Sequence, residues 1–291
     1  MTISEPSDVA VARDDRQRAR RGLALFFTLV IVFEAVVITA MVVTGMYALV
    51  VALMWSVALA SVIARLVLHE GFADVSFRLG GRRSVRWFVI ALLFPQFVGF
   101  VAFGAAWLTG LAPFTSTAED FWTTWLAAST VGTLVSCVYA AGEEIGWRGY
   151  MLTRLIAAGV PRPVLVSGLI WGLWHVPLIL VGLLYAEHPF MPVAAMVFVI
   201  SATATAFVLA RARLESGSLW PCILLHGAYN SVIQAAFWPA AAGGGTSVIW
   251  VDMEAGILVS AVLVLAAVLL CRGSWVFRRT PDEPMAAPAA L

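Results

Sequence analysis

The chain contains no lysine, and charged residues of any kind are scarce. All 18 basic residues are arginine, charged residues make up 12% of the 291 positions, and hydrophobic residues make up 62%. A soluble domain has about 25% charged and about 45–50% apolar residues, so this composition excludes a water-soluble globule. Most of the apolar side chains must face lipid, and the sequence predicts an integral membrane protein.

Cysteine is also rare. Cys137, Cys222 and Cys271 lie far apart in apolar stretches and form no C-x-x-C pair. This spacing excludes a disulfide framework and a cysteine-based zinc site. The net charge is only +1, and the sequence shows no basic patch of the kind that binds nucleic acid. The lipid bilayer is therefore an expected partner, and nucleic acid is not.

Long apolar runs are abundant. A helix that crosses a bilayer needs about 20 mostly apolar residues, and eight such stretches predict an all-α bundle of about eight transmembrane helices. The stretches lie at 22–43, 47–67, 87–110, 121–141, 163–184, 191–210, 219–238 and 249–271. The predicted transmembrane domain, 22–271, follows a polar amino-terminal segment, 1–21, and precedes a Pro/Ala-rich tail, 272–291, that is expected to be disordered.

The arginines predict an orientation. They lie in the amino-terminal segment and after the second, fourth, sixth and eighth stretches, whereas the connections near 44–46, 111–120, 185–190 and 239–248 contain none. Every arginine then falls on one side of an eight-span bundle. Because cytoplasmic connections carry the excess of arginine, both termini are predicted to be cytoplasmic. The lysine-free composition is typical of a GC-rich coding bias, which favours the cytoplasmic membrane of a bacterium.

Ionisable residues inside apolar stretches are informative, because each costs at least about 2.5 kcal/mol at the bilayer centre. The segment AGEEIGWRGYML, 141–152, contains Glu143, Glu144 and Arg148. Glu144 and Arg148 have the i, i+4 spacing and order that favour a helical ion pair. Glu143 is rotated by about 100° and has no partner close in sequence. A solvated charge cluster at a helix end is the plain alternative.

Two histidines and an acid lie in other stretches. His175 follows Trp171 by four residues, and His226 shares a helical face with Asn230 at i, i+4. Polar contact between neighbouring helices is the plain alternative for both histidines. Glu34 lies in the middle of the first stretch without a helical partner at i±3 or i±4, and the sequence assigns it no role.

Together these residues supply a carboxylate, two imidazoles, an amide and a guanidinium. The chain has no G-x-S-x-G elbow and no H-E-x-x-H zinc signature, so a nucleophilic serine hydrolase is poorly supported. A carboxylate–imidazole pair could activate a water against a peptide carbonyl, while a second histidine and an asparagine stabilise the oxyanion. Glu143, His175 and His226 could instead hold a divalent metal. The sequence leaves both alternatives open.

The order E-E-x-x-x-R, W-x-x-x-H and H-x-x-x-N resembles the CPBP (Abi) family of intramembrane endopeptidases, which includes the type II CAAX prenyl endopeptidases. The resemblance covers about residues 121–235. It implies that Glu143 and His175 activate water without needing a cofactor, and that His226 and Asn230 form the oxyanion hole.

The same resemblance implies a supporting role for Glu144 and Arg148. The second motif of the family usually begins with phenylalanine, and Trp171 stands in that place here. The larger ring is expected to narrow the substrate groove.

The implied function is hydrolysis of a peptide bond in a membrane-associated or lipid-modified peptide or protein. The sequence does not give the identity of the substrate, its prenylation or the oligomeric state. A non-catalytic membrane scaffold or bacteriocin-immunity partner is one alternative, and a proton-coupled transporter is another. The polar residues concentrate in the fourth, fifth and seventh stretches without counterparts in the first three, which argues against the repeat symmetry of a transporter.

Overall fold

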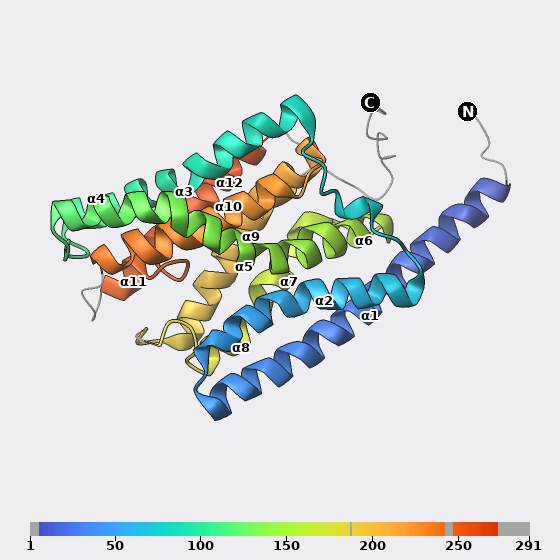
Figure 1. The fold of residues 1–291 in the computed structure, drawn as a ribbon, viewed down its shortest axis with the longest axis horizontal. Helices are drawn as coiled ribbons and strands as arrows, with labels where there is room; N and C mark the ends of the chain where they lie inside the picture. The colour runs from blue at the N-terminus through green and yellow to red at the C-terminus, as the bar shows by residue number, and fades with distance from the viewer. Residues whose placement is uncertain (1–5, 187, 242–246, 273–291) are drawn as a thin grey trace.

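The structure, a computed structural model, describes residues 6–186, 188–241 and 247–272, with only the main chain described over 6–13. Within these ranges the chain is helical and has no strands (Figure 1). This confirms the predicted all-α class. Six of the described helical stretches are long and apolar enough to cross a membrane. They are Asp14–Thr44, Tyr47–Leu68, Gly81–Thr109, Ala118–Ala157, Pro163–Leu180 and Met191–Ser216.

The other two predicted spans are helical but different in kind. The stretch 219–238 forms α10 (Trp220–Val232) and the π-helical η5 (Ile233–Phe237), and this helix carries several polar residues. The stretch 249–271 divides into α11 (Ser247–Val251) and α12 (Ile257–Cys271), and α12 has only 15 residues. The count of eight spans and the cytoplasmic side of the termini stay predictions. The predicted disordered tail lies outside the described residues, except for Arg272.

The first two long helices form an antiparallel hairpin along one side of the molecule (Figure 1). The helix α1 (Pro6–Thr44) turns at Gly45 and the short η1 (Tyr47–Leu49) into α2 (Val50–Leu68). Gly45 has a φ of +68°, a conformation that costs glycine little because it has no Cβ. Since α1 begins at Pro6, it extends well beyond the predicted first span into the polar segment 1–21.

The remaining described elements follow in chain order. They are η2 (Ala73–Val75), α3 (Gly81–Thr109), α4 (Ala118–Ala127), η3 (Ala128–Gly132), α5 (Thr133–Gly146), η4 (Trp147–Met151), α6 (Leu152–Ala157), α7 (Pro163–Trp174), α8 (Val176–Leu180), α9 (Met191–Ser216) and η6 (Pro239–Ala241). The helix α5 packs against both α2 and α10, and α7 packs against α9.

Glycines allow the helices of the core to approach closely. A Cβ on Gly227 of α10 would lie 2.7 Å from the main-chain nitrogen of Cys137 in α5. A Cβ on Gly146 of α5 would lie 2.7 Å from the main-chain oxygen of Val57 in α2. Small residues at such crossings let helix backbones meet in a membrane protein. They bring α2, α5 and α10 into one tightly packed group.

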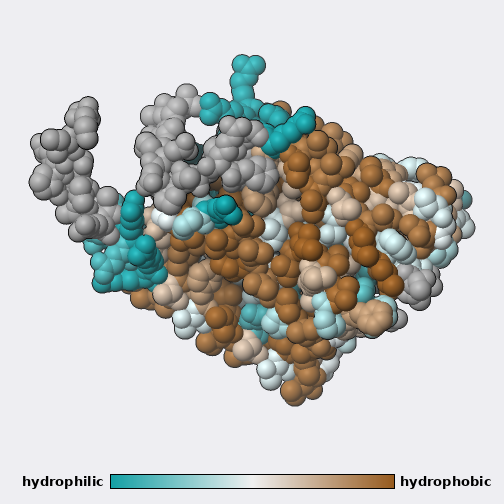
Figure 2. Space-filling view, turned by 180° about the vertical axis from the view of Figure 1, so that it is seen from behind, coloured by the Kyte–Doolittle hydropathy of each residue, from teal (hydrophilic) through white to brown (hydrophobic). Residues whose placement is uncertain are grey.

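The outer surface is apolar over a large area. Figure 2 shows hydrophobic side chains over most of one face, with hydrophilic side chains gathered towards one edge. Val43, Leu108 and Leu134 are among the large apolar residues whose side chains are exposed. Exposed apolar area on this scale marks a surface made for lipid rather than water. The surface therefore agrees with a multi-pass membrane protein.

Candidate active site

Most of the residues singled out by the sequence lie where α5, α7 and α10 converge, whereas Glu34 lies in α1. The helix that carries Glu143 and Glu144 continues through η4 and α6 to Ala157. The π-helical turn η4 contains Arg148, and every residue of this turn is buried. A π turn inserts one extra residue into a helix and is frequent at functional sites.

Glu144 links two of these segments. Its Oε1 accepts a 2.8 Å hydrogen bond from Arg148 Nη1 and a 2.9 Å hydrogen bond from His226 Nδ1. The predicted i, i+4 ion pair is thus present, and its two side chains are 0% and 1% exposed. Glu144 Oε2 and Arg148 Nη2 are buried without a hydrogen-bond partner in the described part of the chain. A buried pair of this kind is sensitive to the loss of either charge.

Glu143 finds its partners among aromatic side chains. Its Oε2 accepts a 2.7 Å hydrogen bond from Trp171 Nε1 and a 3.3 Å hydrogen bond from Trp147 Nε1. Both donors are indoles, which can donate but not accept. Sequence spacing showed no partner for Glu143, although Trp147 stands four residues further along the same helix. The signal that could have found this contact was an indole at i+4.

His175 lies at the break between α7 and α8. Its main-chain N–H bonds to Gly172 O at 3.2 Å, one residue short of the α-helical partner. The carbonyl oxygen of Trp171 instead forms a 2.9 Å hydrogen bond with the ring Nδ1 of His175. A carbonyl oxygen only accepts, so Nδ1 carries a proton, and in the neutral ring Nε2 keeps its lone pair. The break in the helix thus sets the tautomer of His175.

Trp171 lies at the centre of the group. Its ring centroid is 4.1 Å from the guanidinium carbon of Arg148, 5.4 Å from the His226 ring and 5.9 Å from the His175 ring. The side chain is buried. Its predicted place beside the substrate groove stays a prediction.

The polar face of α10 leads outward from this centre. His226 is buried, Asn230 on the next turn is half-buried, and Gln234 is exposed. Gln234 Nε2 donates to Glu254 Oε1 at 3.3 Å, and Tyr185 Oη donates to Glu254 Oε2 at 2.6 Å. Sequence reasoning missed Glu254 and Tyr185, because no local spacing connects them to the motifs.

The metal alternative concerns groups of histidine, cysteine and carboxylate side chains. Among the described residues, no group of three or more histidine, cysteine, aspartate or glutamate side chains is placed to hold one. A metal held by Glu143, His175 and His226 stays a prediction, and no step below passes through a metal. Among the described residues, Cys137 and Cys222 take part in no disulfide.

A family model for the Rce1-like type II CAAX prenyl endopeptidases matches residues 17–232, which is most of the chain. The chain belongs to this family. No curated protein matches it closely. The family match confirms the resemblance drawn from the three motifs. As an Rce1-like protein the chain is a peptide-bond hydrolase of the CAAX prenyl endopeptidase class, and its six long apolar helices make it a multi-pass membrane protein. It acts on a peptide or protein substrate in a membrane.

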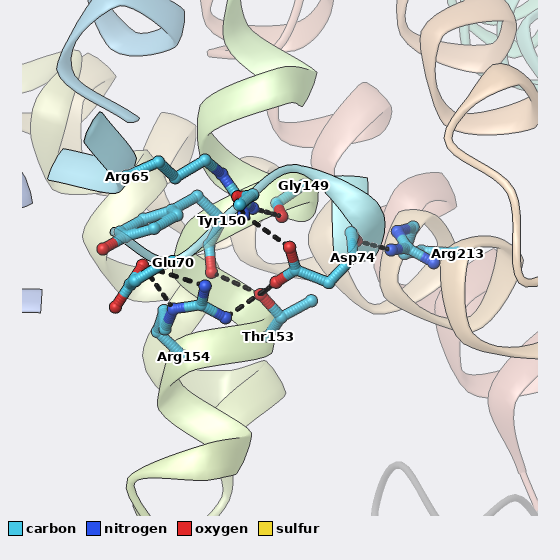
Figure 3. Close-up of polar contacts among 9 residues, drawn as sticks. Arg65, Glu70, Asp74, Gly149, Tyr150, Thr153, Arg154 and Arg213 are labelled. Carbon is cyan, nitrogen blue, oxygen red and sulfur yellow. Dashed lines mark hydrogen bonds and ion pairs between the residues drawn. The ribbon is translucent and has the colours of Figure 1, made fainter. Parts of the chain in front are cut away.

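An ion-pair network in this Rce1-like chain lies beside η4 (Figure 3). Asp74, between α2 and α3, pairs with Arg65 and, at 2.7 Å, with Arg154, and its main-chain oxygen accepts from Arg213 at 2.6 Å. Arg65 also donates to Gly149 O at 2.9 Å. Arg65 thereby connects the network to the turn that carries Arg148. Local spacing in the sequence does not predict these contacts, because the partners lie on separate elements.

The pKa of Asp74 reflects this setting. Partial burial favours the neutral carboxyl, but the hydrogen bond from Arg65 and the charge of Arg154 outweigh it. The pKa of Asp74 is therefore lowered from its usual value. The network holds a carboxylate at neutral pH and fastens the α2–α3 connection to α6 and α9.

Proposed function

We propose that the protein is an intramembrane endopeptidase that hydrolyses a peptide bond in a membrane-associated or lipid-modified peptide or protein. One observation carries the proposal: two carboxylates and two imidazoles from three helical segments meet around the buried ring of Trp171. Ionisable groups inside a membrane bundle are costly and mark functional sites. Their order along the chain matches the motifs of the Rce1-like family.

In the proposed mechanism Glu143 and His175 share one water. Glu143 accepts a proton as the water oxygen attacks the peptide carbonyl, while the Nε2 lone pair of His175 orients the second hydrogen. The proton then passes from Glu143 to the nitrogen of the leaving amine, and the C–N bond breaks. The products are a new carboxyl terminus and a peptide with a free amino group.

The oxyanion that forms during attack needs hydrogen-bond donors, and His226 and Asn230 are suited to that role. His226 Nδ1 bonds Glu144 at 2.9 Å, which leaves Nε2 for the reacting oxygen. Nε2 donates when the ring carries both protons, and the Glu144 carboxylate then compensates the positive charge. The amide of Asn230 supplies the second donor.

The substrate side of the proposal follows from the setting of the site. A buried site in a membrane bundle admits a chain segment that is itself held at the membrane. A lipid-modified segment, cleaved near its carboxyl terminus, meets that requirement. We place the protein in the cytoplasmic membrane of a bacterium, in keeping with its lysine-free composition.

The test compares carboxyl termini of membrane proteins by mass spectrometry. Cells express wild type, Glu143→Gln or Glu119→Gln at equal abundance. Glu119 is exposed in α4, so its variant is a matched control for the same chemical change. New termini in wild type and Glu119→Gln, absent in Glu143→Gln, would support the peptidase and identify its substrate. Identical profiles in all three would reject it and favour the non-catalytic scaffold.

A further inference from the structure

Trp171 contacts both members of the proposed water-activating pair through different atoms. Its indole Nε1 donates to Glu143 Oε2 at 2.7 Å, and its main-chain oxygen accepts from His175 Nδ1 at 2.9 Å. We propose that Trp171 is a positioning residue that aligns the carboxylate of Glu143 and the imidazole of His175 on the same water. This inference rests on the proposed function, in which that pair activates the water.

The indole acts on the carboxylate by fixing its rotation. A hydrogen bond to an ionised carboxylate is shorter and stronger than one between neutral groups. With Oε2 bound to Nε1, the plane of the Glu143 carboxylate is set, and so is the direction of the Oε1 lone pairs. Trp147 Nε1, at 3.3 Å from the same Oε2, adds a longer second contact. A phenylalanine ring at 171 would fill most of the space but has no N–H to donate.

The main-chain oxygen of Trp171 acts on the imidazole. The bond from Nδ1 fixes both the tautomer and the tilt of the His175 ring. A neighbouring ring then holds the plane of the imidazole, since the Phe198 centroid lies 4.6 Å away. Trp171 thus orients both Glu143 and His175.

The indole itself is held in place. The Arg148 guanidinium lies 4.1 Å from its ring centroid, and a cation over an aromatic face is attracted to it. The side chain is only 6% exposed. A side chain locked by packing on both sides can hold a catalytic group in a productive geometry. The N–H of Trp171 therefore points at Glu143 before substrate binds.

Trp174 provides a matched control on the same helix. It is also 6% exposed and it contacts His175, but its Nε1 is buried without a hydrogen-bond partner among the described residues. Exchange of tryptophan for phenylalanine removes similar volume at both positions. It removes a hydrogen bond to the carboxylate only at 171.

The test uses the full-length protein in nanodiscs and a fluorogenic peptide with a farnesylated cysteine followed by three residues. Trp171→Phe is expected to lower kcat by about 10- to 100-fold, the value of a hydrogen bond to a charged group, with KM unchanged. Trp174→Phe is expected to retain kcat far better. Equal losses in both variants, or a change confined to KM in Trp171→Phe, would overturn the positioning role.

A second measurement needs no turnover. With isotope-labelled indoles, the Nε1–H resonance of Trp171 is identified by its loss in Trp171→Phe. It is expected to shift in Glu143→Gln, because the acceptor loses its charge, while the Trp174 resonance stays in place. An unmoved Trp171 resonance would overturn the inference even in an active enzyme. If the resonance shifts but the protein does not cleave the farnesylated peptide, the peptidase proposal is rejected for that peptide. The hydrogen bond by which Trp171 aligns Glu143 is then still supported.

Discussion

Glu144 and His226 are 82 positions apart in the sequence and share a 2.9 Å hydrogen bond inside the bundle. This contact joins α5 to α10 at the level of the proposed active site. The same carboxylate oxygen also accepts a 2.8 Å hydrogen bond from Arg148 Nη1, so Glu144 connects a guanidinium and an imidazole. The family resemblance implies a supporting role for Glu144. Among the proposed site residues whose side chains the structure describes, Glu144 nevertheless makes the only direct carboxylate–imidazole contact.

Glu144→Gln is expected to destabilise the protein by about 3–5 kcal/mol, because it leaves the buried Arg148 without a compensating charge. The free energy of unfolding in mixed micelles, measured by titration with a denaturing detergent, checks this. The double variant Glu144→Gln/Arg148→Met should recover much of the loss, since no unpaired charge is left. A double variant as unstable as the sum of both single variants would contradict the explanation.

Asn230→Ala is expected to lower kcat by about 100- to 1,000-fold with little change in KM, as for the loss of one oxyanion donor. Cleavage of the farnesylated peptide measures both constants. Gln234→Ala, one turn further along the chain in η5, is the control. Gln234 is exposed and bonds Glu254, so its variant should retain wild-type rates. Wild-type activity in Asn230→Ala would remove Asn230 from the mechanism.

Gly227→Ala is expected to push α10 away from α5. The new Cβ would lie 2.7 Å from Cys137 N and 2.8 Å from its Cα and Sγ, and two of these atoms belong to the main chain. Overpacking of this kind costs about 1–3 kcal/mol, and here it also separates His226 from Glu144. The melting temperature and kcat should both fall.

Gly104→Ala serves as the control for that helix crossing. Gly104 lies in the carboxyl-terminal part of α3, and a Cβ there meets nothing within 4 Å. Alanine is favoured over glycine in a helix, so this variant should be as stable as wild type or slightly more stable. If Gly104→Ala is also destabilised, the loss of a glycine, rather than the close approach of α10 to α5, would explain the lower stability of Gly227→Ala.

The Asp74 network predicts a pH dependence of stability on the acid side only. Since the folded pKa of Asp74 lies below its unfolded value, its contribution is fully present above the unfolded pKa of about 3.9 and is lost as pH falls through the folded pKa. Melting temperatures of wild type and Asp74→Asn should differ by a constant amount above about pH 5 and converge below about pH 4. A difference that grows on acidification would contradict this sign.

Local spacing predicted the parts of the site that lie within one helix. The Glu144–Arg148 pair follows from an i, i+4 pattern, and the pairing of His226 with Asn230 on one face follows from the same periodicity. The all-α class follows from the apolar runs. The eight-span count stays a prediction, because α12 has 15 residues, short of the about 20 that span a bilayer.

Contacts between helices could not be predicted from spacing. The Trp171–Glu143 hydrogen bond joins residues 28 positions apart, and Arg65 reaches Gly149 across 84 positions. Each depends on how closely the helices cross, which is decided by side-chain volumes along the whole contact. The break after α7, by contrast, has a local signal, because Pro177 lacks the main-chain N–H that would continue the helix.

The uneven burial of the site restricts how an inhibitor can be built. Every residue of η4 is buried, and Glu143 and His226 are 2% and 6% exposed, whereas His175 and Asn230 are only half-buried. A compound aimed at the Glu143 carboxylate must therefore enter past the imidazole and the amide, with its reactive end leading. Selectivity over relatives with phenylalanine at the position of Trp171 would come from a group that competes for the indole N–H.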